Sequence, residues 1–581
     1  MKKFTAVLVA LVIILTCIAM VACQSTVLVY LENYDGKMTK TIVYDPSIPL
    51  PIPEREGYVF GGWYTDRDLT TPFVNGTKMD SNFHVYAKWT AKQQGGGQGG
   101  GSGNQGGGSG NQGGGSGNQG GGSSTSTPSN VMPKQTYNSS TFDKSNLQQK
   151  TMQYDESQGY DPAIGLPSTG SYHALVIPVE FTGESFTQQE LDDLEKSLNG
   201  PAADTGWESV STYYSKSSYG ALNLTFDVQP AYQVQYSATY YGNYSQKDND
   251  GYYHTGEELI LKEALGHYET VLDLTKYDSN GDGCIDAVYL IYSTDVDYEN
   301  GDSLYWAFTT WYYGDEEYDG LYAYYFLFAG IDFIYESTSK DDFSGAEKIS
   351  GLKINASTYI HETGHLLGLD DYYDYDEESG SNEGLGGADM MDYTVGDQGV
   401  YSKIMLGWIE PTIVNDTATV TIESLQKSSG VRAILIPLNF NNSYFCEYLL
   451  IDLYTADGLN GLHAGATNSY LYEGAEFGVR IYHVSSSINN PYNENSAYGS
   501  FTDYNNTDTN IALIRLVEAD GERKFASSNG LAAKSDLWKK GDKLSSVFKN
   551  YTRNDGKTLC FDIEIVSVSA TSATITVTFA D

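Results

Sequence analysis

Residues 361–371 read His-Glu-Thr-Gly-His-Leu-Leu-Gly-Leu-Asp-Asp, and this stretch decides the fold class that we expect. On a helix, His361 and His365 lie one turn apart on one face, so both imidazoles can reach a single metal ion. Glu362 points away from that face by about 100° and can address a water molecule at the ion without binding the metal itself. Zn²⁺ suits imidazole ligands and, with three protein ligands and one open position, lowers the pKa of its water to about 7. The pattern therefore predicts a hydrolytic zinc site.

The third zinc ligand is expected just after this helix. Gly368 can adopt the left-handed conformation that ends a helix, which lets the chain reverse and brings Asp371 back toward the histidines. Asp370 is the rival third ligand. At the other end of the helix, Asn355 or Ser357 is suited to the N-cap position. The alternative interpretation is a chance H-E-x-x-H on an amphipathic helix, and it leaves the Gly and Asp that follow at the right distances without a reason.

A second motif, at residues 278–289, is typical of a calcium loop. Oxygen-bearing side chains stand at loop positions 1, 3 and 5, and Gly283 stands at position 6. Position 12 holds Tyr289 instead of the usual bidentate Glu, and we expect the aspartate at position 9 to substitute for it. The expected Ca²⁺ ligands are Asp278, Asn280, Asp282, Cys284 and Asp286. The alternative is an Asn/Gly-rich turn with solvated carboxylates.

Composition excludes several classes of protein. The chain has 581 residues and a formal net charge of −41, and a polyanion of this size repels phosphate backbones, which argues against nucleic-acid binding. A hydrophobic content of 40% and 49 tyrosines favour packed domains rich in β-structure. Among the cysteines, one Cys446–Cys560 bridge can be drawn, but nothing in the sequence selects it over buried free thiols.

The N-terminus is typical of an export signal. Residues 1–23 combine a basic start with an apolar run that ends in Met20-Val21-Ala22-Cys23. The small residues before Cys23 resemble the lipobox of bacterial lipoprotein signals, which implies a lipidated Cys23 anchored to the outer face of a bacterial cell membrane. One alternative is an uncleaved transmembrane anchor, because ~19 apolar residues can just span a bilayer. Another is a released extracellular form.

The rest of the chain divides by composition into five segments. Residues 24–92 alternate apolar and polar positions, which indicates a small β module, and Gly/Ser/Asn/Gln repeats then make residues 93–129 a flexible tether. Residues 130–169 are interpreted as a lead-in or a prosegment. Residues 170–412 mix strands and helices and are expected to form the metallopeptidase domain. The repeated short strands of residues 413–581 suggest a β-sandwich-like C-terminal region.

A family resemblance covers residues 170–490. The string H-E-x-x-H-x-x-G-x-x-D, followed by residues 387–393 and 403–408, resembles the immune inhibitor A-like secreted metallopeptidases, a metzincin-related group. Residues 210–224 upstream and 478–484 downstream match in the same order.

This resemblance implies a role for each site residue. It makes His361, His365 and Asp371 the zinc ligands and Glu362 the general base. It also makes Met391 the Met-turn residue beneath the metal. Tyr393 would support the transition state, and core packing is the alternative for it.

The N-terminal module carries a second resemblance. Residues 57–64 and 85–89, with their paired tryptophans Trp63 and Trp89, resemble the internalin B-repeat, a β-grasp-like surface module. That family implies a surface or adhesive spacer with a surface ligand as a partner, and no chemistry of its own.

We therefore expect an α+β protein with a zincin or metzincin-like catalytic domain, a small β-grasp-like N-terminal module and a β-sandwich-like C-terminal region. The expected function is that of a surface-anchored, zinc-dependent endopeptidase acting on extracellular proteins or peptides. The alternative function is that of an adhesin-like binding lipoprotein that uses the zincin domain as a scaffold.

Overall fold

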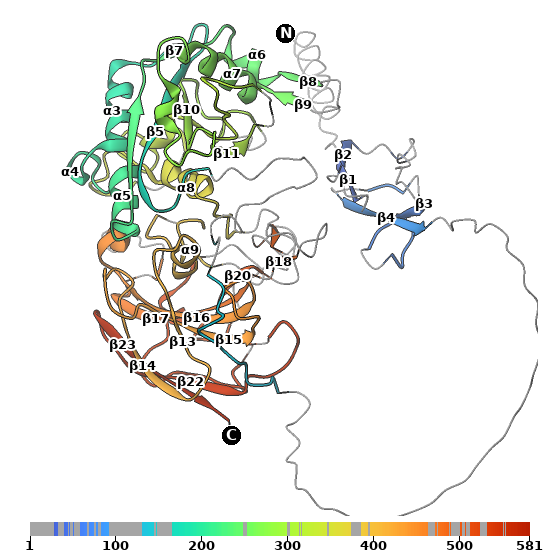
Figure 1. Ribbon diagram of the computed structural model, residues 1–581, viewed down its shortest axis with the longest axis vertical. Coiled ribbons are helices and arrows are strands. Elements are labelled where there is room, and N and C mark those ends of the chain that lie inside the picture. The colour runs from blue at the N-terminus through green and yellow to red at the C-terminus, as the bar shows by residue number, and fades with distance from the viewer. Residues whose placement is uncertain are drawn as a thin grey trace, which may run out of the picture. The chain divides into compact units, whose positions relative to one another are not determined.

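The computed structural model divides the chain into two compact units, Met1–Gly122 and Ser123–Asp581 (Figure 1). It describes residues 28–32, 40–43, 46, 50, 58–66, 69–74, 77–79, 83–91, 131–144, 147, 165–247, 253–298, 303–312, 314, 316–344, 348–373, 385–392, 395–462, 471–472, 474–486, 488–489, 500–501, 506, 512–522, 531–549, 551 and 553–580. Within these residues, every helix is too short or too polar to cross a membrane. The predicted signal, its Cys23 and the tether of residues 93–129 lie outside them.

The first unit is a four-stranded sheet. Its strands are β1 (Leu28–Glu32), β2 (Lys40–Val43), β3 (Tyr58–Tyr64) and β4 (Phe83–Ala91), in the spatial order β2-β1-β4-β3. β1 and β4 pair in parallel, and the other pairs are antiparallel. Trp63 is buried in the core of this sheet and meets Phe60 edge to face, with ring centroids 5.4 Å apart.

The second unit begins with a mixed sheet in the order β11-β12-β10-β5-β6, with β7 beside β5. Its strands are β5 (Gly170–Glu180), β6 (Leu222–Val228), β7 (Tyr232–Gln233), β10 (Val288–Tyr292), β11 (Phe308–Trp311) and β12 (Tyr325–Gly330). β10 pairs in parallel with both neighbours and is buried at every position, as expected for an apolar strand covered on both faces. β11 is antiparallel to β12 and forms one edge of the sheet.

Helices and short elements accompany this sheet. The helices are α3 (Gln188–Asn199), α4 (Ala202–Thr205), α5 (Val210–Ser217), α6 (Ala238–Gly242), α7 (Gly256–Tyr268), α8 (Ser357–Leu366) and α9 (Val400–Met405). The 3₁₀ turns are η2 (Leu274–Tyr277), η3 (Ile331–Tyr335), η4 (Gly458–Asn460) and η6 (Lys534–Asp536), and β8 (Ser245–Lys247) pairs with β9 (Tyr253–Thr255). α8 and α9 lie between the mixed sheet and the C-terminal strands (Figure 1).

The C-terminal strands form two sheets. One has the order β13-β15-β16-β17-β20, and its strands are β13 (Thr412–Ile413), β15 (Ala433–Asn439), β16 (Glu447–Thr455), β17 (Phe477–Ser485) and β20 (Ile514–Leu516). The other has the order β14-β23-β22-β21, and its strands are β14 (Ala418–Glu423), β21 (Lys543–Leu544), β22 (Phe561–Val568) and β23 (Ser572–Phe579). β18 (Ile488–Asn489) and β19 (Ser500–Phe501) form a separate pair.

The strand β16 explains why the boundary expected at residue 412 falls inside one compact unit. All nine of its residues are buried. Because successive side chains of a strand point to opposite faces, Leu449 and Ile451 enter the core between the two C-terminal sheets. Leu450 and Tyr454 enter the core that continues into the half with the mixed sheet. The C-terminal region is therefore packed against the candidate catalytic half on a continuous apolar surface.

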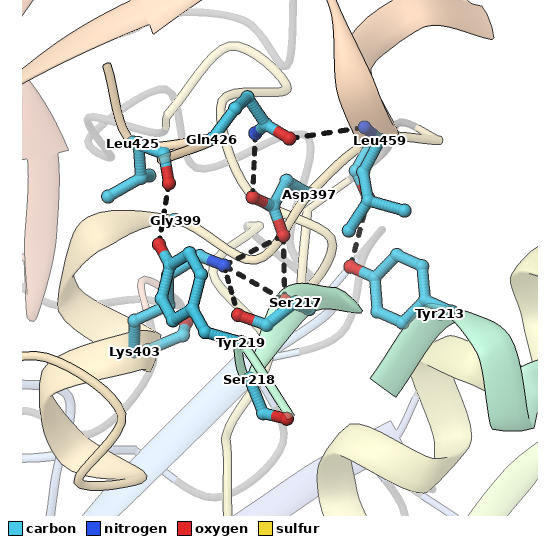
Figure 2. A network of polar contacts seen from close by, with 12 residues as sticks. Tyr213, Ser217, Ser218, Tyr219, Asp397, Gly399, Lys403, Leu425, Gln426 and Leu459 are labelled. Atoms are coloured by element: carbon cyan, nitrogen blue, oxygen red, sulfur yellow. Dashed lines mark hydrogen bonds and ion pairs between the residues drawn. The ribbon is translucent and has the colours of Figure 1, made fainter. Parts of the chain in front are cut away.

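A buried polar network around an ion pair joins the same two halves (Figure 2). Lys403 of α9 is fully buried, and its Nζ lies 2.9 Å from Asp397 Oδ1. Lys403 Nζ also donates to Ser217 O at the end of α5 (2.5 Å), and Ser217 Oγ donates to Asp397 Oδ1 (2.6 Å). From the C-terminal half, Gln426 Nε2 donates to Asp397 Oδ2 (2.7 Å). Removing one partner would leave a buried charge uncompensated, so this network fixes the two halves to each other.

Residues 131–144 of the lead-in dock on the C-terminal sheets. Near the start of this segment, Met132 is buried in the core between these sheets, and its N–H donates to Thr558 O (3.0 Å). Further along, the ring of Phe142 stacks on Phe440 with centroids 6.0 Å apart. These residues are thus built into the C-terminal region.

Candidate metal centre

The helix α8 carries the H-E-x-x-H residues and is fixed at both ends. Its N-cap is Ala356, one residue from each of the two positions expected, and Asn355 Oδ1 accepts a hydrogen bond from the Ser357 N–H (3.0 Å). At the other end, Gly368 has φ +87°, the left-handed conformation that a helix exit requires. Within the helix, a Cβ on Gly364 would lie only 2.4 Å from Met391 Sδ. Glycine at this position therefore lets the Met391 side chain pack directly under α8.

Four side chains converge on one point beside α8. Ligand atoms of His361, Glu362 and His365 lie within 4.8 Å of one another. Asp371 Oδ1 lies 2.9 Å from His361 Nε2 and 3.4 Å from His365 Nε2. Tetrahedral coordination with bonds of about 2.0–2.1 Å places ligand atoms about 3.3 Å apart, so these separations fit three ligands of one zinc ion. Asp370, the rival third ligand, is half-buried in the same turn.

The outer hydrogen bonds of both histidines orient their Nε2 atoms toward this point. His361 Nδ1 is 2.9 Å from Met390 O, and His365 Nδ1 is 2.7 Å from Leu369 O. A backbone carbonyl can only accept a hydrogen bond, so each Nδ1 carries a proton, and the proton that a metal ion would displace is the one on Nε2. This is the second-sphere arrangement that metal-ligating histidines use.

The electrostatics of the cluster favour a bound positive charge. Burial lowers the pKa of His365, but the Asp371 carboxylate outweighs this effect and raises it to about 10. Burial raises the pKa of Asp371, yet the two histidines hold it well below its usual value. The pKa of His361 is also raised, because its hydrogen bond to Asp371 outweighs burial. The donor set therefore attracts a cation, whether protons or a metal ion.

Glu362 is placed beside this donor set with one oxygen available. The residue is 6% exposed, and its Oε2 is buried without a hydrogen-bond partner among the described residues. Burial raises the pKa of Glu362, and the charges of His365 and His361 oppose that rise. The backbone of Glu362 is tied to the edge strand β11, because Thr309 Oγ1 donates to Glu362 O (2.9 Å). A buried carboxylate with an open oxygen is suited to exchange protons with a small molecule.

The predicted Met-turn residue lies below the cluster. Met391 is fully buried, and its carbonyl accepts a hydrogen bond from the Tyr372 N–H (2.8 Å), the residue that follows Asp371. Asp389 fixes the same turn by accepting from the N–H groups of Met391 (3.0 Å) and Gly399 (2.9 Å). Tyr393, the predicted support of the transition state, lies outside the described residues.

The predicted calcium loop is arranged differently. Its carboxylates bind the loop's own backbone: Asp278 Oδ1 accepts from the N–H groups of Gly281 (2.7 Å) and Asp282 (3.1 Å). Asp282 Oδ1 accepts from the Cys284 N–H (2.9 Å), and Asn280 Nδ2 donates to Asp282 Oδ2 (2.9 Å). Close groups of acidic, His or Cys ligand atoms occur among the described residues at His361–Glu362–His365 and at Glu518–Asp520–Asp536. The loop's aspartates are therefore not gathered as closely as the histidine site is.

One residue of this loop, Asp286, has a carboxylate oxygen that is available to bind an ion. Asp286 is 1% exposed; its Oδ2 accepts from the Ser279 N–H (3.0 Å), but its Oδ1 is buried and has no partner in the described part of the chain. Burial raises the pKa of Asp286 to about 6.

The three cysteines Cys284, Cys446 and Cys560 are free and buried, so the structure contains no Cys446–Cys560 bridge.

Sequence reasoning missed several residues of the site. Thr309 reaches α8 from a strand that is distant in the chain, and nothing in its local sequence distinguishes it. The carbonyls of Leu369 and Met390 act through the backbone and so have no residue-type signal. Outside this site, the acidic group of Glu518, Asp520 and Asp536 also has no local sequence signal, because its residues are spread over two segments.

Comparison with known proteins identifies one part of the chain. Residues 28–88 match the family model of the Listeria-Bacteroides repeat domain. This repeat is typical of surface proteins, which confirms the prediction of a surface-associated repeat at the N-terminus. A search of curated proteins finds no match to the chain.

Proposed function

We propose that this chain is an extracellular zinc-dependent endopeptidase of the immune inhibitor A-like, metzincin-related type. The observation that carries the proposal is the position of Asp371 Oδ1, 2.9 Å and 3.4 Å from the Nε2 atoms of two histidines whose Nδ1 atoms face carbonyls. This donor set, with Glu362 beside it, matches what a hydrolytic zinc site requires: three ligands, an oriented second sphere and a separate base.

In this proposal, His361, His365 and Asp371 hold the ion and leave one position open. When bound, zinc supplies a Lewis acid that polarises the scissile carbonyl and acidifies a water molecule. Glu362 accepts the proton of that water as it attacks the carbonyl carbon, and then gives the proton to the leaving amine. The unpartnered Oε2 and the raised pKa of Glu362 suit a group that both takes and returns a proton.

The neighbouring edge strand supports a peptide as the substrate. Among the described strands, β11 pairs only with β12, and it is joined to α8 through Thr309. An extended peptide can add to such an edge by main-chain hydrogen bonds, which bind many sequences and hold the scissile bond in a fixed register. Extracellular proteins with an exposed extended segment are therefore the proposed substrates.

The proposed location is the outer face of a bacterial cell, with a lipid on Cys23 as the anchor. The surface-type repeat at residues 28–88 and the Gly-rich composition of residues 93–129 support a tethered enzyme. An adhesin-like binding lipoprotein is the second candidate, and the repeat favours it. A scaffold without activity, however, gives no reason for a buried Glu362 beside three convergent ligands.

A digest of an unbiased peptide library, with and without a chelator, tests the proposal. The matched variants are Glu362→Gln and Glu208→Gln, because both glutamates are 6% exposed and each has a buried oxygen without a partner among the described residues. We expect Glu362→Gln to lower kcat/KM by about 10²–10⁴-fold while zinc stays bound, because general acid–base catalysis contributes that much. Glu208→Gln should cleave as wild type does. Wild-type cleavage by Glu362→Gln would refute the proposal.

A further inference from the structure

The C-terminal region contacts the candidate metal centre through two segments, residues 369–373 and residues 387–392, which we call the support loops. The first loop carries Asp371, and its Leu369 carbonyl faces His365 Nδ1 (2.7 Å). The second carries Met390, whose carbonyl faces His361 Nδ1 (2.9 Å). The two loops are hydrogen-bonded to each other from Tyr372 N to Met391 O (2.8 Å). Any group that holds these loops also sets the direction of the three proposed ligands.

Arg480 of β17 holds the second support loop. Its guanidinium is buried and binds the cross-strand Asp452 of β16 with two nitrogens, Nε to Oδ1 (2.8 Å) and Nη2 to Oδ2 (2.5 Å). The remaining nitrogen, Nη1, donates to Ala388 O (3.1 Å), two residues before Met390. Because the guanidinium is a rigid fork, the strand pairing fixes where this third donor points. The ion pair within the sheet thereby positions a carbonyl in the loop above it.

Asn506 holds the first support loop in a similar way. It is fully buried, and its Nδ2 donates to Tyr372 O (2.8 Å), next to Asp371. The same amide is tied to β20, because Nδ2 donates to Ile514 O (2.7 Å) and Oδ1 accepts from the Ile514 N–H (3.2 Å). Arg480 lies in the five-stranded sheet and Asn506 is hydrogen-bonded to it, and in this sheet β17 pairs with β20.

We propose that Arg480 and Asn506 are positioning residues, through which the C-terminal region holds the support loops and so orients the ligands of the candidate metal centre. In this account, the C-terminal sheets complete the catalytic unit, and the unit is inactive without them. As a statement about zinc, the inference rests on the proposed function. As a statement about the support loops, it can be measured without any metal.

The variant Arg480→Lys separates positioning from charge. A lysine keeps a positive charge opposite Asp452, but its single nitrogen does not supply a rigid third donor to Ala388 O. The matched control is Arg553→Lys. Arg553 is also a buried arginine of the C-terminal region; it faces Glu447 (3.3 Å) and donates to Leu438 O (3.1 Å), a carbonyl of β15 instead of a support loop. Asn506→Asp is a second variant, since it replaces the donor facing Tyr372 O by an acceptor of the same shape.

Two readouts are taken on the full chain. Amide hydrogen exchange is followed in peptides that cover the support loops, and zinc affinity is measured by competition with a chelator. We expect Arg480→Lys and Asn506→Asp to speed exchange in both loops by about tenfold or more. They should also weaken zinc binding by about 10–100-fold, as changes in second-sphere partners do. Arg553→Lys should leave both quantities close to wild type.

Each outcome has a distinct meaning. If loop exchange and zinc affinity are unchanged in Arg480→Lys and Asn506→Asp, or change equally in Arg553→Lys, the positioning role is overturned. The proposed function is then left intact. Faster loop exchange in Arg480→Lys and Asn506→Asp, in a chain whose wild type binds no zinc, would support the positioning role and refute the proposed function.

Discussion

Two histidine–carboxylate centres of the second compact unit have opposite character. At the candidate metal centre, His361 and His365 share Asp371, and their Nδ1 atoms face carbonyls. In the C-terminal region, His483 Nε2 donates to Glu447 Oε1 (2.9 Å), but its Nδ1 accepts from Arg515 Nη2 (2.8 Å). At the first centre, the Nε2 atoms of both histidines face one shared carboxylate. The second uses both nitrogens of its histidine within the protein.

A histidine next to a carboxylate is therefore not in itself a metal site. The protein supplies the positive charge at the second centre, because Arg515 and Arg553 lie beside His483 and Glu447. Burial and Arg515 lower the pKa of His483 to about 4, whereas Asp371 raises that of His365 to about 10. Asp371, in contrast, faces the Nε2 atoms of two histidines.

The largest expected effect concerns the shared carboxylates of the two centres. We expect Asp371→Asn to weaken zinc binding by more than about 100-fold, beyond the range typical of second-sphere changes, because it removes a charged ligand. Glu447→Gln removes the matching carboxylate of the His483 centre and should leave zinc affinity unchanged. Chelator competition on both variants measures the difference. Equal zinc affinities in the two variants would show that the two centres do not differ in zinc binding.

A smaller effect is expected in the pH dependence of stability. The folded pKa of His483, about 4, lies below the unfolded value of about 6.5. Above pH 6.5 the residue is neutral in both states, and as pH falls below 6.5 the unfolded chain takes up a proton that the folded chain resists. The free energy of unfolding should therefore fall by roughly 1 kcal/mol between pH 6.5 and 5.5 from this residue. Urea unfolding of His483→Gln should lack this part of the slope, whereas a variant of the exposed His173 should retain it. An identical slope in His483→Gln would show that His483 is not held neutral.

The smallest effect concerns the calcium loop, which has an open carboxylate oxygen like Glu362 but no histidines. If Asp286 Oδ1 completes a calcium site with a dissociation constant of about 1 mM, the weak end for extracellular modules, then about 1 mM Ca²⁺ stabilises the fold by about 0.4 kcal/mol. Asp286→Asn should lose this gain. Thermal unfolding with calcium, with magnesium and with chelator measures it, and a calcium response unchanged in Asp286→Asn would exclude Asp286 as a ligand.

The local geometry of the candidate site could be predicted from the sequence because short-range rules control it. The four-residue spacing of His361 and His365 on a helix sets their common face, and Gly368 sets the reversal that returns Asp371. The supports of the site could not be predicted, since Thr309, Arg480 and Asn506 reach it only through strand order and register.

The sequence contains a signal that the two halves pack together. The alternation of apolar and polar residues alone does not reveal it. β16 is apolar or aromatic at most of its nine positions, and such a run is typical of a strand buried on both faces. The strands β22 and β23 of the other C-terminal sheet alternate between buried and more exposed positions, as sandwich strands do. A boundary drawn from strand repetition at residue 412 therefore separates sequence segments that the fold packs together. Similarly, the loop at residues 278–286 has the residue spacing of a calcium loop, but its aspartates accept hydrogen bonds from the loop's own amides. The spacing alone does not predict these hydrogen bonds.

Elemental analysis of the purified chain measures directly whether His361, His365 and Asp371 bind zinc. We expect one zinc per chain under metal-replete conditions, retained in His483→Gln and lost when His361 and His365 are both replaced by alanine. A wild-type chain without zinc, or a double variant that keeps it, would contradict the account.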